Sequence, residues 1–300
     1  MNTAFPVIAN VNYGVGLCLN LIVLFFLLIG VSKRLGSYRY LHITFIIFNV
    51  TWTTFCWQCM GKLYTTKSKF CLFLLHNWFD SLHFVCLYNA FFSLFMVVVP
   101  LHFLYRYWML YSPSHIKLFS GYRYVLTLCS FAIPEFAIWY AASFFLFKAS
   151  DDQRAEVASA LQQAYGIDAL SNPMIIGEYF RDGRYNLPSV AGLLVFVGIV
   201  VLECGVMLFC TIRIYVYLAG ARTYSVTARK FHRTIFVILI IQNAFPLVLI
   251  HINVGAYLIA PLFAIEINLS RDFTVLVAHF FVPLDALAIL TLLPEYRRAI

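Results

Sequence analysis

Charged residues are scarce in this chain. Asp, Glu, Lys and Arg make up 11% of its 300 residues, whereas soluble globular proteins carry about 25%. Hydrophobic residues make up 62%, and they form long runs separated by short polar segments. This composition excludes an ordinary soluble protein. It predicts an all-α membrane protein that forms one helical bundle without a separate soluble domain.

Catalytic and metal-binding motifs are also missing. The sequence contains no HExxH, GxSxG or P-loop pattern. Cys56 and Cys59 form a CxxC pair, but neither a second pair nor a His at metal-binding spacing accompanies it. We therefore expect neither an enzyme nor a metal or cofactor site. The net charge of +8 comes from small basic groups between apolar runs, so we expect no nucleic-acid partner.

Two further absences concern Cys and Lys. None of the eight cysteines lies in the long segment 148–189, so no disulfide can tie this segment to a neighbouring helix. The last apolar run, 273–293, contains no Lys. This excludes an opsin, because retinal needs a Lys there for its Schiff base.

Seven apolar runs are long enough to cross a bilayer, because about 20 helical residues span its ~30 Å hydrocarbon core. The start of the third run is ambiguous, since 71–79 is also apolar. That helix either begins early or follows an interfacial segment that carries Trp78. The expected spans are 7–31, 41–61, 82–105, 124–147, 190–217, 234–258 and 273–293.

The basic residues predict the orientation, because Lys and Arg accumulate on the cytoplasmic side of a membrane. With the amino terminus outside, thirteen of the twenty-one Lys and Arg lie on the inner side, and Glu295 is the only acidic residue there. We therefore expect an extracellular amino terminus, a cytoplasmic carboxyl terminus and a long extracellular loop over 148–189. Asn268 begins a sequon in a short outer loop, which makes it a candidate glycosylation site.

The long outer loop contains one predicted helix. The segment 151–165 has good helix formers and two acidic residues at its start, and Gly166 would end it. Two interpretations stay open: this loop is either a lid over an outward-facing cavity or a solvated connector.

Polar residues inside the spans are the candidates for function, because burying them in lipid is costly. Glu135, Glu203 and Asp285 have no basic partner within the spans. They either serve a ligand, a cation or a proton, or they hold helices together by hydrogen bonds. The polar positions at middle or outer depth are the candidate ligand contacts: Tyr88, Asn89, Glu203, His251, Asn253 and His279.

The sixth span has a polar stripe. Gln242, Pro246 and Asn253 are spaced by four and seven residues, so they share one helix face, which we expect to point inward. Pro246 kinks the helix and either allows it to swing or bends it statically. With Pro283 and Asp285 in the last span, Gln242 and Pro246 form a candidate conformational switch.

Several motifs resemble those of one receptor family. The third span ends in LHFLYRY at 101–107, and the sixth begins after SVTAR at 225–229 and contains QNAFP at 242–246. The last span contains PLD at 283–285 and is followed by EYRRAI at 295–300, while AYGID at 164–168 is a weaker match. As a set these resemble the FxYRY and accompanying motifs of the nematode Str-type serpentine chemoreceptors.

The resemblance implies a G-protein-coupled receptor with seven transmembrane helices, which binds a small odorant-like molecule and contacts a heterotrimeric G protein. It implies a plasma-membrane protein, expected in a sensory cilium. The residues that would face the G protein are Tyr105, Arg106, Tyr107, Arg229, Lys230 and Arg233. The family usually continues past its Tyr-Arg close with a cytoplasmic tail, whereas this sequence stops at Ile300.

A transporter or ligand-gated channel is the alternative, and the three unpaired acidic residues motivate it. Its usual signs are weak, because the sequence shows no internal repeat and no matching pair of Gly/Pro-broken spans.

Overall fold

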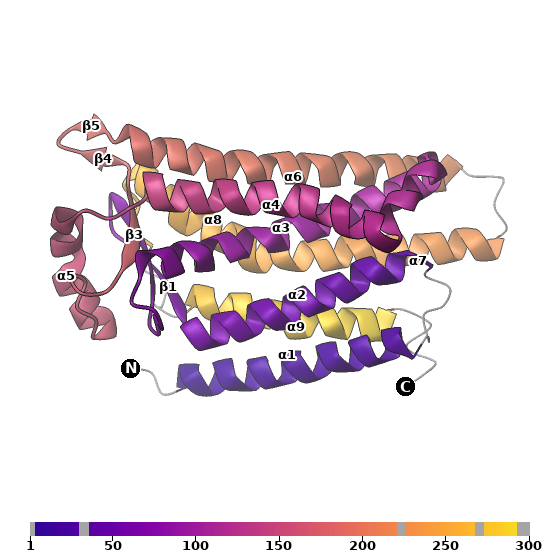
Figure 1. Cartoon of the computed structure of the whole chain (residues 1–300), viewed down its shortest axis with the longest axis horizontal. Coiled ribbons are helices and arrows are strands. Elements are labelled where there is room, and N and C mark those ends of the chain that lie inside the picture. The colour runs from indigo at the N-terminus through magenta and orange to yellow at the C-terminus, as the bar shows by residue number, and fades with distance from the viewer. Residues whose placement is uncertain (1–3, 30–35, 221–225, 268–272, 293–300) are drawn as a thin grey trace.

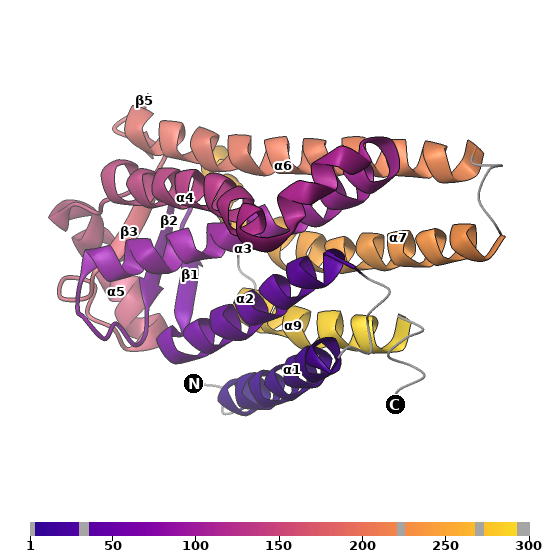
Figure 2. The same ribbon diagram turned by 45° about the vertical axis from the view of Figure 1, so that its right-hand side comes forward.

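The chain folds into an elongated helical bundle with a small mixed cap at one end (Figures 1 and 2). The structure is a computed structural model that describes residues 4–29, 36–220, 226–267 and 273–292. The long helices of these residues are α1 (Ala4–Leu28), α2 (Tyr38–Cys59), α3 (Leu82–Tyr111), α4 (Gly121–Leu146), α6 (Leu187–Gly220), α7 (Val226–Pro246) and α9 (Phe273–Leu292). The π-helical segment η3 (Leu247–His251) and helix α8 (Ile252–Ile259) continue α7 towards the cap.

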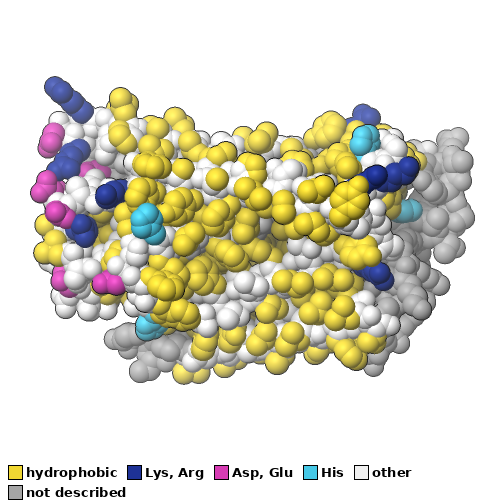
Figure 3. All heavy atoms as spheres, viewed as in Figure 1, with side chains coloured by type: hydrophobic (Ala, Val, Ile, Leu, Met, Phe, Trp, Pro, Cys, Tyr) yellow, Lys and Arg dark blue, Asp and Glu magenta, His cyan; other side chains and the backbone are white. Residues whose placement is uncertain are grey.

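The helix surface suits a lipid environment. In Figure 3, hydrophobic side chains cover the middle of the visible face, and charged ones gather towards its two ends. Among the described residues, the helices long and apolar enough to cross a membrane are Val7–Leu28, Leu82–Tyr111, Gly121–Leu146, Leu187–Gly220 and His232–Phe263. Helices α2 and α9 lie beside them and complete a bundle of seven.

The predicted spans fall on these helices, although the exact limits of the bilayer stay a prediction. Two helices differ most: α7 begins eight residues before the predicted start at 234, and α3 continues six residues past the predicted end at Tyr105 before Ser112 ends it. The short 3-10 helix η2 (Pro113–Phe119) then leads into α4. Helix α3 packs against α2, α4 and α6, while α1 packs against α9.

The cap corrects one of the two expectations for the apolar segment 71–79. This segment does not extend α3, because its first part belongs to a β-hairpin. Trp78 is exposed and lies between this hairpin and α3, and its interfacial position stays a prediction. Strands β1 (Gly61–Thr65) and β2 (Lys69–Leu74) pair antiparallel, and β2 also pairs antiparallel with β3 (Met174–Glu178) from the long outer loop. Strand β2 is buried along its whole length, so it has no polar alternation. A fully buried strand and a short apolar helix look alike in sequence.

The predicted helix in the outer loop is confirmed. Helix α5 (Asp151–Tyr165) starts with a capping box, in which Ser150 and Gln153 each accept a backbone hydrogen bond from the other. It ends at Gly166, whose φ of 70° is a left-handed conformation that favours glycine. A second, two-stranded ribbon, β4 (Phe180–Arg181) and β5 (Arg184–Tyr185), connects β3 to α6.

Ion pairs hold the cap together, and all eight cysteines are free. Lys69 of β2 contacts the carboxylate of Glu156 on α5, and its Nζ lies 3.1 Å from Oε1 of Glu178 on β3. Gln153 donates a 2.7 Å hydrogen bond to the other Glu178 oxygen. Burial lowers the pKa of Lys69, but its hydrogen bonds to Glu156 and Glu178 outweigh this effect and raise the pKa above its ordinary value. The ammonium therefore stays charged, and it joins three cap elements.

Replacing Lys69 tests this role. Because Lys69→Met leaves the buried carboxylate of Glu178 with only Arg181 as a cation, 3.9 Å away, we expect it to destabilise the protein by at most ~3–5 kcal/mol. The measurement is the Tm of the purified protein in detergent. Lys67→Met removes an exposed Lys from the same hairpin and is the control. Equal Tm values for the two variants would contradict the role of Lys69.

Candidate ligand cavity

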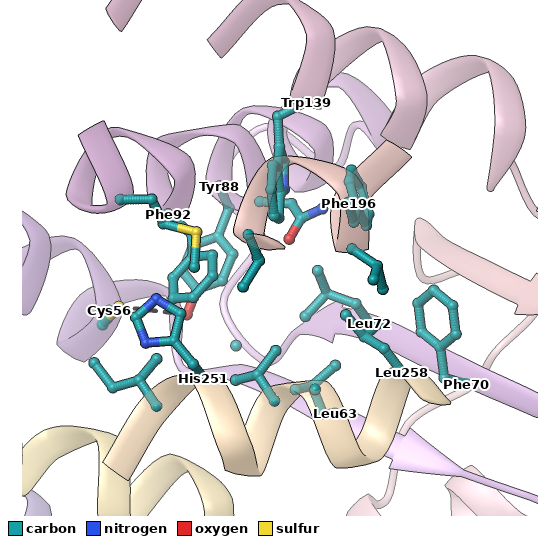
Figure 4. A pocket seen from close by; sticks show the side chains of 18 of the residues that line it. Cys56, Leu63, Phe70, Leu72, Tyr88, Phe92, Trp139, Phe196, His251 and Leu258 are labelled. Carbon is teal, nitrogen blue, oxygen red and sulfur yellow. Dashed lines mark hydrogen bonds between the residues drawn. The ribbon is translucent and has the colours of Figure 1, made fainter. Parts of the chain in front are cut away.

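A cavity of about 270 Å³ lies directly beneath the cap (Figure 4). The strands of the cap form its roof, through Leu63, Phe70, Leu72 and Ile175. Its walls come from α2, α3, α4, α6, η3 and α8. The long outer loop thus contributes Ile175 to the cavity, which agrees with the lid interpretation rather than with a solvated connector.

Aromatic rings make up much of the cavity wall. Trp139 of α4 stacks on Phe196 of α6, with ring centroids 4.1 Å apart and planes 15° from parallel. Phe92 of α3 and Trp52 of α2 line other parts of the wall, with ring centroids 5.8 Å apart. Such contacts fix the wall geometry, since each aromatic pair adds ~0.5–1.5 kcal/mol beyond its buried area.

Polar groups are few in the cavity. The Tyr88 hydroxyl donates a 3.5 Å hydrogen bond to the Sγ atom of Cys56, and Nδ2 of Asn89 donates to Ser143 at 2.9 Å. His251 has its Nδ1 atom 2.8 Å from the carbonyl oxygen of Pro246. A carbonyl oxygen only accepts, so Nδ1 carries the proton and Nε2 is left as an acceptor. Among the described residues that line the cavity, none is Asp, Glu, Lys or Arg.

The structure brings together three of the six candidate ligand contacts: Tyr88, Asn89 and His251. Glu203 lines a smaller cavity of about 10 Å³, which shares His251 and Met96 with the main one. The side chain of His279 lies outside the described residues.

Asn253 does not lie on the inward helix face where the polar stripe was expected to place it. It does not line the cavity, and its amide donates to the carbonyl oxygens of Val248 and Leu249. The reason is η3, the π-helical segment between Pro246 and Asn253. A π-bulge changes the helical register, so an offset of seven residues no longer returns to the same face. Pro246 predicted a break in the helix, but the sequence did not indicate that a π-helical segment would follow it.

Sequence reasoning missed most of the wall, including Trp139, Phe196 and the roof residues Phe70 and Leu72. Aromatic and aliphatic residues that line a cavity have the same pattern as those that fill a core. The signal that existed was the segment 61–74, whose β-branched and aromatic residues fit a strand.

A second polar cluster lies deeper in the bundle. Asp285 of α9 is fully buried and accepts hydrogen bonds from Asn49 of α2, at 3.3 Å, and from Gln242 of α7, at 3.1 Å. This cluster joins α2, α7 and α9, and α2 is far from the other two helices in sequence. Gln242 and Asp285 were candidate switch residues, whereas Asn49 was missed, although an Asn within an apolar run is itself a signal.

The other two intramembrane acids are neighbours. Glu135 of α4 and Glu203 of α6 lie close enough to perturb each other, and Oε1 of Glu135 has no hydrogen-bond partner among the described residues. The expectation that these acids lack basic partners holds for the described residues, but they are not isolated.

Arg106 departs from its expected position at the cytoplasmic surface. It is 6% exposed, and its guanidinium carbon lies 3.8 Å from the ring centroid of Tyr38 on α2. Its Nε and Nη2 atoms have no hydrogen-bond partner among the described residues. Helix α3 extends to Tyr111, so Arg106 lies more than a turn inside the helix. In this conformation Arg106 therefore faces the bundle and not a partner.

The other candidate G-protein contacts differ in how far they are exposed. Tyr105 is buried, whereas Tyr107 is half-buried with its ring 5.5 Å from that of Phe209, and Arg233 is exposed. The side chains of Arg229 and Lys230, and the whole of Asn268, lie outside the described residues. Pro283 lies within α9 beside the first helix, where Gly16 leaves room for its ring.

The comparisons with known proteins agree with this architecture. A family described as "Serpentine type 7TM GPCR chemoreceptor Str" matches residues 5–300. The chain belongs to this Str family. The expected family and the seven-transmembrane receptor fold are thereby confirmed, and the chain is a multi-pass membrane protein of a receptor family, not of an enzyme class.

Relatives of this Str-family receptor are similar over almost the whole chain. "Serpentine receptor class r-10" of Caenorhabditis elegans is 24% identical over 292 residues, which cover 94% of this chain and 86% of that protein. "G-protein coupled receptor str-33" of the same species is 22% identical over 280 residues, covering 88% and 80%. Among solved structures, squid rhodopsin superposes with a TM-score of 0.64 at 12% identity, covering 99% of this chain and 83% of that chain.

The burial of Arg106 leads to a stability prediction for this Str-family receptor. Arg106→Met removes a buried charge with two unsatisfied N–H groups and keeps most of the volume. We expect the Tm to rise, by about 2–4 °C for each kcal/mol gained. The control is Arg39→Met, which replaces an exposed Arg near Tyr38 and should leave the Tm unchanged. A fall in Tm specific to Arg106→Met would show that the contact with Tyr38 outweighs the cost of burial.

Proposed function

We propose that this receptor binds a small, neutral, odorant-like compound in the capped cavity and signals to a heterotrimeric G protein. The observation that carries the proposal is the cavity itself: it is closed by the cap, walled by aromatic rings and free of charged side chains among its described lining residues. In the cell, the receptor lies in the plasma membrane with its amino terminus outside, and we place it in a sensory cilium.

The lining determines the class of compound. An ionised ligand would lose its hydration without gaining a counter-ion, which costs several kcal/mol or more. A neutral compound with one or two oxygens instead finds Nε2 of His251 as an acceptor, and it gains the Tyr88 hydroxyl as a donor when this hydroxyl exchanges its 3.5 Å bond to Cys56 for one to the ligand. The volume of about 270 Å³ is below the ~300–1,000 Å³ of pockets for drug-sized ligands, which favours a compact molecule.

Signal transmission would pass through the sixth transmembrane segment. His251 reaches the cavity and is also hydrogen-bonded to Pro246, where the α-helix becomes π-helical. A ligand that binds Nε2 more tightly in one arrangement of η3 shifts the population towards that arrangement. One turn below Pro246, Gln242 bonds to Asp285, so movement there changes the packing against α9 and α2.

At the inner end we propose that Arg106 leaves Tyr38 when α7 moves and then contacts the G protein. Its two unsatisfied N–H groups favour such a release, since they would gain partners at a protein interface or in water. Exposed Arg233, and Arg229 and Lys230 earlier in α7, would add positive charge to the same surface.

The test is a second-messenger assay in cells that express the receptor with or without a Gα subunit. We expect some small neutral alcohols, ketones or esters to evoke a Gα-dependent cAMP, cGMP or calcium response, and matched carboxylic acids or amines to evoke none. Odorant-evoked current without Gα would instead indicate the channel alternative.

Two glycine variants connect such a response to the cavity. Gly255 of α8 lines the cavity, and a Cβ there would meet no atom within 4 Å. Gly255→Leu therefore fills space needed by the ligand, and we expect the EC50 to rise at least tenfold. Gly198→Leu, on α6, also meets open space but lies outside the lining, so it is the control. Unchanged responses for both variants at equal surface expression would place the ligand elsewhere.

A further inference from the structure

We propose that the ligand reaches the cavity sideways, from the lipid bilayer, through a seam between α6 and α8, and that it is a neutral compound which partitions into lipid. This inference deepens the proposed function and rests on it for the nature of the ligand. The seam itself is a property of the fold.

The direct route from the outside is blocked. Three of the four roof residues, Phe70, Leu72 and Ile175, are 1%, 7% and 1% exposed, and the fourth, Leu63, is half-buried. The ion cluster around Lys69 clamps the roof to α5 and β3 on its outer side. Strand β3 meets α3, α4 and α6 below it, so the roof is packed on both faces.

The side towards lipid is different. Of the described residues that line the cavity, Val201 on α6 and Ile259 on α8 are the exposed hydrophobic ones, at 63% and 38%. Each of these side chains thus contacts the cavity on one side and the outside of the bundle on the other. They belong to the two helices that border the seam.

The packing around the seam allows it to open. Helix α6 packs closely against α3 and α4, but it makes little direct contact with α8. The cap fixes only the outer end of α8, where the Tyr179 hydroxyl donates a 2.8 Å hydrogen bond to the Leu258 carbonyl oxygen. Below this point the borders of the seam are apolar side chains, Val197, Val200, Val201 and Val254, so separating the two helices there breaks no side-chain hydrogen bond.

The bilayer would then act as the reservoir of ligand. Transfer of each CH₂ group from water to an apolar environment is favourable by ~0.8 kcal/mol, roughly a fourfold enrichment per methylene. A lipophilic compound thus concentrates beside Val201, whereas an ion does not reach it. The access route and the uncharged lining therefore both favour a neutral, lipophilic ligand.

Cys56 offers a direct test, since its thiol lines the cavity. The receptor is reconstituted in phosphatidylcholine vesicles and treated with either of two thiosulfonates, the neutral benzyl methanethiosulfonate or a trimethylammonium-ethyl analogue. Peptide mass spectrometry follows the modification of each cysteine with time. Cys18, exposed on the outer surface of α1, reports the reagent concentration in the bilayer.

We expect the benzyl reagent to modify Cys56 at least tenfold faster than the cationic reagent does. The rate for the benzyl reagent is first divided by its rate at Cys18, which corrects for its concentration in the bilayer. Val201→Trp should slow this reaction at least fivefold by obstructing the seam. Leu202→Trp places the same ring on an adjacent, 69% exposed position outside the lining and should leave the rate unchanged.

Three results would overturn the lateral route. These are faster modification of Cys56 by the cationic reagent, no modification of Cys56 by the benzyl reagent while Cys18 reacts, and equal rates in the Val201→Trp and Leu202→Trp receptors. If Lys69→Met accelerates the modification of Cys56 while Val201→Trp leaves its rate unchanged, the access route is through the cap and not through the seam. The assay needs neither agonist nor G protein, so its failure is separate from a failure of the proposed function.

Discussion

The cap depends on the buried ammonium of Lys69. Lys69 meets Glu156 and Glu178 where a hairpin, a helix and a loop strand converge, and both carboxylates come more than eighty residues after Lys69 in the sequence. Because the ammonium is surrounded by carboxylates, the sheet below it stays closed. That closed sheet roofs the gap between the helix ends and makes it a cavity. The chemistry of the cavity therefore follows from an electrostatic contact that lies outside it.

Polar side chains in the bundle also depend on close partners within the protein. Lipid offers no hydrogen bonds, so polar side chains in the helices find each other. Asp285 accepts hydrogen bonds from Asn49 and Gln242, Glu135 faces Glu203, and Nδ1 of His251 donates to the Pro246 carbonyl oxygen. Arg106 contacts an aromatic ring and a sulfur atom but lacks partners for two of its nitrogen atoms. Buried polar atoms without a partner also occur on neutral side chains of the bundle, among them Asn20, Asn49, Thr53 and Trp139.

The helices and the family were predictable from the sequence, because hydropathy and a few spaced motifs act locally. Helix α5 was predictable to the residue, since its capping box and Gly166 are local signals. The β-hairpin was not, because burial on both faces removes the alternation that marks a strand. Tyr88, Asn89 and His251 reached the cavity as expected, but the π-helix displaced Asn253 from it. Registers and aromatic walls depend on tertiary packing, which spacing along the chain does not encode.

The absence of a covalent link in the cap has a consequence for how the protein matures. All eight cysteines are free thiols, and the pKa of buried Cys71 in β2 is raised to about 12, which leaves little of the reactive thiolate. The cap can thus assemble without an oxidising compartment or a disulfide isomerase. Synthesis in a reducing cell-free extract supplied with lipid should give the same cap as synthesis through the secretory pathway. Thiol reductants, which loosen disulfide-linked extracellular loops, would leave this receptor intact.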